Sequence, residues 1–319
     1  MRVLRPLSIF LLFVWAVTVH AKTRTFSIFH TNDWHSRFLG FGPNSEYSPD
    51  TANDDDTVGG VARRAALLYK RREIMATKGP VLTLDGGDFM MGSLFHTLNG
   101  DEAFELRLMA QMGYDAITLG NHDFEWGPKG LAKMVRRALK EGPIPAIVAA
   151  NTVLSEKEPG DDDVAILYKN GHISPHIILE REGLRFGIFG LIGAHAVEVT
   201  KTAAPLTFIA AKVAAAQQVK LLKKKRVDVI IALSHSGVWQ KQGVWAFEDV
   251  ELAKSVAGID IIVSGHSHQV VKKPIIVGKT VIVQAGSLGA YLGELTVTHQ
   301  EGGPVKVQNY ELHEINDTI

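Results

Sequence analysis

The sequence predicts an α/β protein with a layered core and a mixed β-sheet, and three observations support this class. The chain has 319 residues, 46% of them hydrophobic and 8% aromatic, which is enough to bury a substantial core in one large domain or two ordinary ones. Short apolar runs typical of strands alternate with longer segments that have helical periodicity. This alternation predicts parallel strands joined by right-handed crossovers, and the shorter strands near the end indicate a mixed sheet.

The predicted elements follow one another in a regular order. Strands are predicted where five to seven consecutive residues are mainly apolar or β-branched: 25–31, 80–84, 115–119, 145–150, 186–192, 227–233, 259–263, 280–285 and 294–298. Helices are predicted where apolar residues recur every three or four positions over eleven residues or more: 61–77, 102–112, 129–140, 210–225 and 247–257. The sequence contains no internal repeat and no clear interdomain linker.

Two polar stretches, residues 41–60 and 155–164, interrupt this pattern and are interpreted as insertions or rim loops. Each contains an acidic run, at 54–56 and 161–163, that could bind calcium. Runs of this kind are usually solvated turns, and this is the interpretation that we favour.

Residues 1–21 have the pattern of a cleaved signal peptide. Arg2 and Arg5 precede the apolar run LSIFLLFVWAV, and the small residues of TVHA follow it. The run is shorter than the roughly 20 apolar residues that span a bilayer, so an uncleaved membrane anchor is the weaker alternative. The sequence therefore predicts one domain over residues 22–319, located in the periplasm or secreted, with no membrane contact after cleavage.

Charge and cysteine content exclude several classes of protein. Removing residues 1–21 takes away two of the 34 basic residues and none of the 34 acidic ones, which leaves a formal charge of −2. This balance argues against a nucleic acid polymer as the main partner. The sequence contains no cysteine, which excludes a disulfide framework, a thiolate metal site and a cysteine nucleophile.

Polar residues with metal-binding side chains follow five of the predicted strands. The motifs are HTNDWH (30–35), DGGD (85–88), GNHD (120–123), SHSG (234–237) and SGHSH (264–268). In an open α/β sheet, the carboxyl ends of the strands form the edge at which ligands bind. Their carboxylate, imidazole and amide groups are ligands that borderline divalent metals accept. The motifs hold too many such groups for one ion, but they suffice for two ions if one aspartate bridges them.

Each motif has a simpler explanation when it is taken alone. Asp33 and His35 could belong to a turn with a capping aspartate, and GGD could be only a turn. Their occurrence in order at five strand ends instead favours a centre with two metal ions. The remaining histidines are expected to be surface or core residues; they include His30, His96, His172, His176 and His195.

The ordered set D-x-H, GGD, GNHD, an isolated histidine and GH-x-H resembles the calcineurin-like metallophosphoesterases. Finer features resemble the bacterial secreted 5′-nucleotidase family over nearly the whole chain after the signal peptide: GGVARRA (59–65), DGGDFMMGS (85–93) and MGYDAITLGNHDFEWG (112–127). The resemblance implies a four-layer αββα sandwich, in which helices flank two mixed β-sheets and the metal ions lie at the sheet edge.

The resemblance also implies roles for individual residues. Asp33, His35 and His268 would bind one metal, Asn121, His235 and His266 the other, and Asp88 would bridge them. The two divalent ions could be manganese, zinc, cobalt or iron. A hydroxide between the ions would attack phosphorus in line.

His122 would stabilise the developing charge or protonate the leaving oxygen. Asp123 and Glu125 are both candidates for orienting its imidazole. The commonest family pattern has an aspartate three residues after this histidine, where this chain has Glu125. Asp85 is interpreted either as a residue that holds a ligand or loop in place or as a turn-forming aspartate.

The length of the chain is a second departure from the family pattern. Nucleotidases of this family usually carry a C-terminal domain whose aromatic residues stack on the nucleobase, and this chain stops at ELHEINDTI (311–319), which is interpreted as the start of the connection to such a domain. Base recognition therefore cannot be carried over. The enzyme could hydrolyse simpler phosphate esters, depend on a partner chain that completes the site, or have low selectivity, and loop 41–60 could form part of the substrate rim.

The predicted function is hydrolysis of nucleotides or related small phosphomonoesters by a secreted, metal-dependent enzyme. The same centre could act on 2′,3′-cyclic phosphodiesters, nucleotide-sugar pyrophosphates or sulfur-linked sulfate. An alternative of another class is a non-catalytic metal-binding module, against which the non-ligand His122 argues. Dinucleotide binding through GIFGLIG (187–193) is disfavoured, because its glycine spacing is not G-x-G-x-x-G.

Overall fold

The computed structural model describes residues 23–42, 57–155 and 157–319. The predicted signal peptide, residues 1–21, and the acidic run 54–56 lie outside the described residues. Among the described residues, no helix combines the length and the apolar character needed to cross a bilayer.

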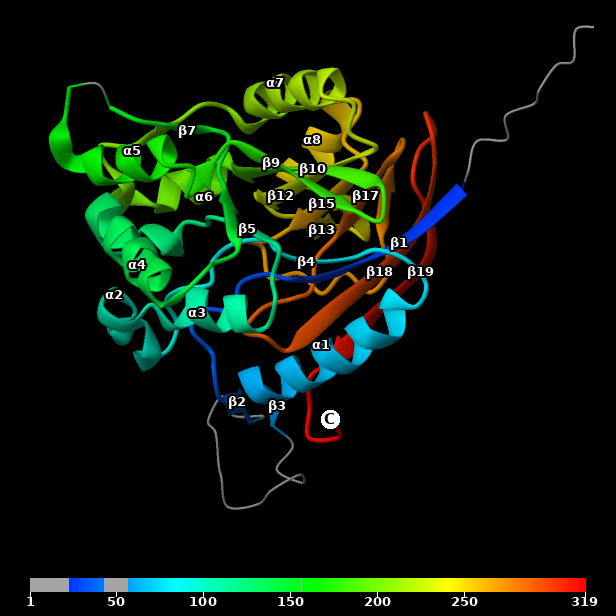
Figure 1. Cartoon of the computed structure of the whole chain (residues 1–319), viewed down its shortest axis with the longest axis horizontal. Helices are drawn as coiled ribbons and strands as arrows, with labels where there is room; N and C mark the ends of the chain where they lie inside the picture. The colour runs from blue at the N-terminus through cyan, green and yellow to red at the C-terminus, as the bar shows by residue number, and fades with distance from the viewer. Residues whose placement is uncertain (1–22, 43–56, 156) are drawn as a thin grey trace, which may run out of the picture.

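The first sheet has seven strands in the order β19-β18-β1-β4-β5-β6-β8 (Figure 1). Its parallel strands are β1 (Thr23–Thr31), β4 (Val81–Asp85), β5 (Ala116–Thr118), β6 (Ala146–Val148) and β8 (Ile173–Ser174). β18 (Tyr291–Gln300) and β19 (Lys306–Glu314) extend it as antiparallel strands.

The second sheet has six strands in the order β16-β17-β15-β12-β10-β9. Its parallel strands are β10 (Leu184–Ile192), β12 (Val229–His235), β15 (Ile261–Ser264) and β17 (Thr280–Val283). The antiparallel strands β9 (His176–Arg181) and β16 (Ile275–Val277) form its two edges. Both sheets are therefore mixed, as the sequence predicts.

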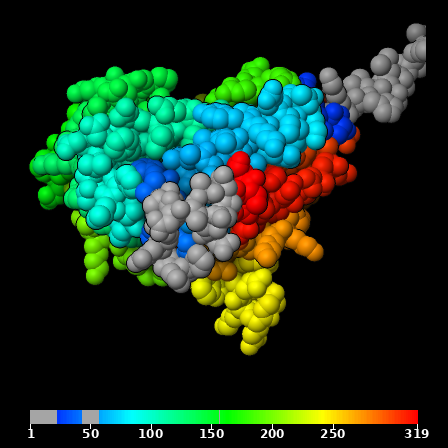
Figure 2. Space-filling model, turned by 90° about the horizontal axis from the view of Figure 1, so that it is seen from below, coloured from blue at the N-terminus to red at the C-terminus, as the bar shows by residue number. Residues whose placement is uncertain are grey.

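Three pairs of short strands lie outside the two main sheets. They are β2 (Gly40–Phe41) with β3 (Val58–Gly59), β7 (Thr152–Val153) with β11 (Thr207–Phe208), and β13 (Trp239–Lys241) with β14 (Val244–Ala246). Figure 2 shows the yellow segment that contains β13 and β14 projecting from the body of the molecule.

Helices cover the outer face of each sheet. α1 (Val61–Ala76), α3 (Phe104–Gln111), α4 (Gly127–Glu141) and α5 (Asp162–Lys169) pack on the first sheet, and α7 (Ala211–Lys224) and α8 (Glu248–Ser255) pack on the second. The short helices are α2 (Asn99–Glu102), α6 (Ala194–Val199), and the 3₁₀ helices η1 (Leu94–Leu98), η2 (His122–Phe124), η3 (Pro159–Asp161) and η4 (Lys201–Ala203). The four layers confirm the predicted αββα sandwich.

The layers explain why the strands have such apolar sequences. Along β10, Phe186 and Ile188 belong to the core between the two sheets, whereas Phe189 and Leu191 belong to the core under α7 and α8. Successive side chains of a strand point to opposite faces, so a strand that is covered on both faces must be apolar at nearly every position. Burying each of these large side chains contributes roughly 1.5–3 kcal/mol.

The interpretation of residues 155–164 as a loop is wrong at its C-terminal end. Asp161 is fully buried, and its Oδ2 accepts a hydrogen bond from the backbone N–H of Ser155 at 2.7 Å. Asp162 and Asp163 lie in the first turn of α5, where negative charge is favourable at the positive end of the helix dipole. The acidic run 161–163 is therefore a helix start rather than a solvated turn.

The interpretation of residues 311–319 as a connecting segment is wrong for the first five of them. Residues 311–314 are the last four of β19, which pairs with β18 along its length. Ile315 is fully buried, and its backbone exchanges hydrogen bonds with Gly59 and Ala290. This part of the chain belongs to the first sheet.

Candidate metal centre

The carboxyl ends of β1, β4 and β5 in the first sheet and of β12 and β15 in the second meet at one edge of the sandwich. Six of the seven predicted ligands, together with His122, form three groups whose ligand atoms lie within 4.8 Å of one another: Asp33, His35 and His268; His35, Asp88 and His122; and Asp88, His235 and His266. The seventh, Asn121, places its Oδ1 3.2 Å from Nε2 of His235. The structure therefore brings all seven side chains together.

The first cluster consists of Asp33, His35 and His268. Nε2 of His268 lies 3.2 Å from Oδ1 of Asp33 and 2.9 Å from Nε2 of His35. Nδ1 of His35 lies 2.8 Å from the carbonyl oxygen of Met91, to which it donates, so its Nε2 is the unprotonated nitrogen that faces the cluster. Converging donor atoms of this kind suit one metal ion.

The second cluster consists of Asp88, His235 and His266. Nε2 of His235 lies 3.1 Å from Oδ2 of Asp88, and its Nδ1 donates to the carbonyl oxygen of Gly86 at 2.8 Å. Asp88 also belongs to the group with His35 and His122, so it lies between the two clusters. This is the position that a bridging carboxylate would need.

Burial and charge shape the electrostatics of this centre. Burial alone would raise the pKa of Asp88, but the neighbouring His235 and further imidazoles outweigh it and hold that pKa well below its usual range. Burial alone would lower the pKa of His235, but the Asp88 carboxylate outweighs this and raises it. The two groups form a buried ion pair when no metal is bound.

The backbone is strained at five of the seven predicted ligands. Positive φ angles occur at Asp33 (52°), His35 (52°), Asp88 (56°), His266 (71°) and His268 (55°). Such left-handed conformations cost about 1–3 kcal/mol for residues other than glycine and persist where the surrounding structure enforces them, typically at functional sites. Here the turns that follow the strands place all five side chains in the two clusters.

One glycine beside the centre is required by close packing. A Cβ atom added to Gly120 would lie 2.1 Å from Oδ1 of Asp88. Only glycine therefore allows the loop after β5 to approach the carboxylate that the two clusters share.

His122 lies beside the clusters and is held by two contacts. Its backbone N–H donates to Oδ1 of Asp88 at 2.8 Å, and its Nδ1 lies 2.7 Å from Oε1 of Glu125. Its ring contacts that of His35, with centroids 5.3 Å apart. The side chain of His122 is 28% exposed, so a ligand can reach its other nitrogen. The longer side chain of Glu125 thus reaches the imidazole despite the departure from the family pattern.

Asp123 does not orient His122, contrary to one of the two sequence-based candidates. Its Oδ2 accepts hydrogen bonds from the backbone N–H groups of Asp88 at 3.0 Å and Gly120 at 2.7 Å, and its Oδ1 accepts from that of Met90 at 3.1 Å. The Asp123 carboxylate thus points away from the imidazole. It links the DGGD loop to the GNHD loop by accepting hydrogen bonds from the backbone of both.

Asp85 supports the same region from within the first sheet. It is fully buried, its Oδ1 accepts from the backbone N–H of Gly87 at 2.9 Å, and its Oδ2 accepts from the Thr31 hydroxyl at 2.6 Å. Burial raises the pKa of Asp85 to about 7. Asp85 holds the turn that precedes Asp88. It is therefore both a turn-forming aspartate and a residue that keeps a predicted ligand in place, the two interpretations drawn from the sequence.

His195 is a contact of the centre that the sequence interpretation missed. It is an exposed residue, as expected, but its Nδ1 also lies 2.7 Å from Nε2 of His266, a contact that the sequence did not predict. His195 follows the end of β10, as the predicted ligands follow other strands, and this was the available signal. By contrast, His30 is a core residue as expected, and burial lowers its pKa to about 3.

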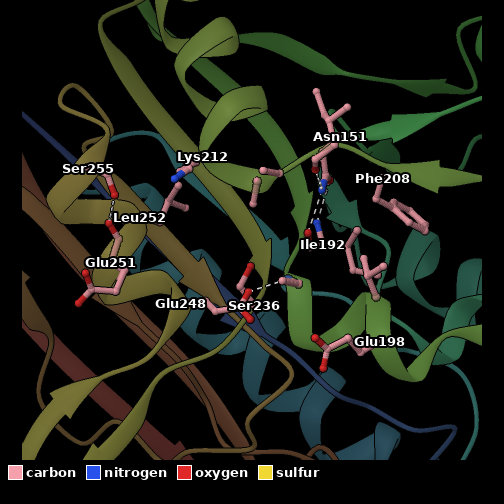
Figure 3. Close-up of a pocket in the computed structure, with 15 residues that line it drawn as sticks. Asn151, Ile192, Glu198, Phe208, Lys212, Ser236, Glu248, Glu251, Leu252 and Ser255 are labelled. Atoms are coloured by element: carbon pink, nitrogen blue, oxygen red, sulfur yellow. Dashed lines mark hydrogen bonds between the residues drawn. The ribbon is translucent and has the colours of Figure 1, made fainter.

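A cavity of about 530 Å³ lies between α6, the start of α7 and α8 (Figure 3). Its lining includes Asn151, Phe208, Lys212 and Glu248, and none of the seven predicted ligands contributes to it. It adjoins the centre through Ser236, the chain neighbour of His235.

The layered fold, with carboxylate–imidazole clusters at the edge of its sheets, is typical of proteins that bind divalent metal ions there. The chain belongs to the calcineurin-like phosphoesterase family, whose sequence profile matches residues 26–270. Family membership implies divalent metal ions, and the clusters described above could hold them.

Individual relatives agree with this assignment. The chain is 30% identical over 308 residues to the trifunctional nucleotide phosphoesterase protein YfkN of Bacillus subtilis, covering 90% of this chain and 19% of that protein. It is 34% identical over 305 residues to 5′-nucleotidase of Bos taurus, covering 89% of this chain and 48% of that protein. The chain thus spans about half or less of the length of these curated relatives.

Solved structures with the same fold include two nucleotidases. The 5′-nucleotidase precursor from Thermus thermophilus has a TM-score of 0.72 and 29% identity, with 91% of this chain and 54% of that chain covered. The NAD nucleotidase of Haemophilus influenzae has a TM-score of 0.73 and 24% identity, with 92% and 57% covered, and is similar in fold alone.

Proposed function

We propose that the chain hydrolyses nucleotides or related small phosphomonoesters at a centre of two divalent metal ions. The observation that carries this proposal is the set of three interlocking groups around Asp88, with the non-ligand imidazole of His122 beside them. Asp33, His35 and His268 would hold one ion, Asn121, His235 and His266 the other, and Asp88 would bridge them. The donor set suits manganese, zinc, cobalt or iron.

When bound, the two ions would supply Lewis acidity for the phosphoryl oxygens and lower the pKa of the attacking water. The contribution of the chain is to fix the donor atoms that face each other across the two clusters. Carbonyl oxygens accept the Nδ1–H of His35 and His235, which leaves the Nε2 of each ring available as a ligand.

His122 would act on the leaving group. Its Nδ1 donates to the Glu125 carboxylate, which fixes the orientation of the ring. Nε2 of His122 is then the atom that would contact the phosphate and donate a proton to the leaving oxygen. A purely structural metal site would not need such a group, and this supports an enzyme over the non-catalytic module.

Nucleotides are the preferred substrate class because similar proteins are named nucleotide phosphoesterase and 5′-nucleotidase. Cyclic phosphodiesters, nucleotide-sugar pyrophosphates and sulfur-linked sulfate remain alternatives at the same centre, because the ligands do not distinguish them. We propose no nucleic acid polymer as a partner. A second chain that completes a nucleoside site is a further alternative, and assays of the purified chain alone would test that need.

The proposed activity is tested by phosphate release from the purified protein, with added Mn²⁺ and after chelation. The substrates are a panel of nucleoside monophosphates, a cyclic nucleotide, a nucleotide sugar and an aryl phosphate. Chelator-sensitive release from the nucleoside monophosphates is the expected result. Release from only the aryl ester or a diester would move the assignment to another phosphoesterase, and no turnover with any metal would favour the non-catalytic module.

We also propose that the protein is exported and that residues 1–21 are removed. Arg2, Arg5, the apolar run and the small residues that follow support this proposal. N-terminal sequencing of the protein recovered from its native compartment should begin at Lys22. Recovery of an intact Met1 in a membrane fraction would support the anchor instead.

A further inference from the structure

His195 contacts the proposed metal centre from outside its clusters. Nδ1 of His195 lies 2.7 Å from Nε2 of His266, and the two ring centroids are 5.0 Å apart. His195 nevertheless belongs to none of the three groups whose ligand atoms lie within 4.8 Å of one another. Its imidazole therefore reaches the centre through His266.

The position of the proton on His266 decides which of the two imidazoles donates the hydrogen bond. A neutral imidazole carries one N–H, and a metal binds the nitrogen that lacks it. If Nε2 of His266 donates to Nδ1 of His195, then Nδ1 of His266 is free to bind the metal. Metal-ligating histidines commonly donate their second ring N–H to an acceptor that orients the ring.

The other two buried histidines of the centre follow this rule. His35 donates to the carbonyl oxygen of Met91, and His235 donates to that of Gly86, both at 2.8 Å. At His266 the corresponding acceptor is the imidazole of His195 rather than a backbone carbonyl. The contact thus completes a pattern that the structure already shows twice.

His195 is exposed, but its position is fixed by its neighbours. The Glu248 carboxylate accepts hydrogen bonds from the backbone N–H of His195 at 2.9 Å and from that of Ala194 at 2.7 Å. The ring of Phe247 packs edge-on against the imidazole, with centroids 5.9 Å apart. Gly193 permits this approach, because a Cβ atom there would lie 2.3 Å from Oε2 of Glu248.

We propose that His195 is a positioning residue that orients His266 for binding the second metal ion. This inference rests on the proposed metal centre and adds to it a residue that acts through a ligand. It follows that the affinity of the second site for its metal ion depends on a hydrogen-bond acceptor at the position of Nδ1 of His195.

The test is a Mn²⁺ titration of the metal-free protein, in which free Mn²⁺ is followed by electron paramagnetic resonance. H195A should weaken the binding of one of the two ions by about 10–100-fold, the usual cost of losing an outer partner of a ligand. H195N should restore most of the affinity, because Oδ1 of asparagine stands near the place of Nδ1. H172A, in the turn between α5 and β8, is the control and should bind like the wild type.

Two results would overturn the proposal while leaving the metal centre in place. One is an unchanged Mn²⁺ affinity in H195A. The other is a lower coordination number in the absorption spectrum of Co²⁺-loaded H195A, because His195 would then be a ligand itself. A wild-type protein that binds no Mn²⁺, Co²⁺ or Zn²⁺ would overturn the metal centre and this inference together, which separates the two kinds of failure.

Discussion

In the described part of the chain, carboxylates are buried beside imidazoles at the candidate metal centre and in the network of Arg71, Glu294 and His313. In the network, Arg71 donates two hydrogen bonds to Glu294, at 2.7 and 2.8 Å, and Nε2 of His313 lies 2.9 Å from the same carboxylate. Burial alone would raise the pKa of Glu294, but His313 and Arg71 outweigh it and lower that pKa to about 2. The network is neutralised by a permanent cation of the fold.

The metal centre has no such cation. Asp33 and Asp88 are 0% and 2% exposed, and the ion pairs of both involve histidines only, with no Lys or Arg from the described part of the chain. Buried carboxylates are costly unless a positive charge compensates them. Acidic residues gathered at a sheet edge without Arg or Lys therefore need protons or metal ions from solution, and a metal ion that binds there would displace protons.

Neutralising Asp88 is the most direct way to break the centre, and it should have the largest effect. D88N keeps the shape of the side chain and its acceptor for the His122 N–H but removes the charge that both clusters share. We expect loss of at least one of two metal ions per chain and a fall in kcat/KM well beyond the roughly 100-fold cost of losing an outer partner. Elemental analysis and kinetics would check this, and retention of both ions would refute the bridging role.

Removing the His122 imidazole should separate chemistry from metal binding. H122A should keep its metal content and lose about 10²–10⁴-fold in kcat, the usual contribution of a general acid. The measurement is kcat on an aryl or nucleoside phosphate beside the metal content of the same sample, with H172A as the control. Loss of metal in H122A would instead assign His122 a ligand role, since it belongs to one of the three groups.

Changing Glu125 tests a smaller contribution within the same centre. E125Q keeps an oxygen acceptor for Nδ1 of His122 but removes the negative charge beside the imidazole. We expect kcat to fall by about 10-fold with KM little changed, at the low end for an outer partner of a functional residue. Equal kcat for E125Q and the wild type would show that the hydrogen bond only positions the ring.

The matching change in the Arg71–Glu294–His313 network should affect stability but neither metal content nor turnover. E294Q should lower the free energy of unfolding at pH 7 by about 1.5–3 kcal/mol, the range for hydrogen bonds to a charged group. The pKa of Glu294 is lower in the fold than its ordinary 4.5, so its stabilisation is complete above about pH 4.5 and is lost as the pH falls toward about 2.

Urea unfolding of the wild type and E294Q between pH 7 and about pH 3.5 would measure this dependence. The stability difference between them should narrow below about pH 4.5. A difference that stays constant over the whole range would mean that the charge of Glu294 contributes little, and that packing around β18 accounts for the effect.

Much of the fold could be predicted because its signals are local. The double-sided burial of β10 appears in the sequence as an unbroken apolar run, and α4 appears as apolar residues at helical spacing. α5 was missed because eight residues with only Val164 and Leu167 buried are too few to show a period. The whole of β19 was missed because partly exposed strands at a sheet edge carry a weak apolar signal.

The candidate site, like the fold, could be predicted from the sequence only in part. The gathering of these residues was predictable from the sequence alone, because the carboxyl ends of parallel strands lie at the same edge of a sheet. The directions of three side chains became clear only in the folded structure. Asp123 faces backbone N–H groups, Glu125 reaches His122, and His195 contacts His266, 71 positions further along the chain. These side-chain directions depend on how the two sheets and the turns after their strands pack together. The spacing of residues in the sequence does not encode them, because the partners lie on different strands and turns.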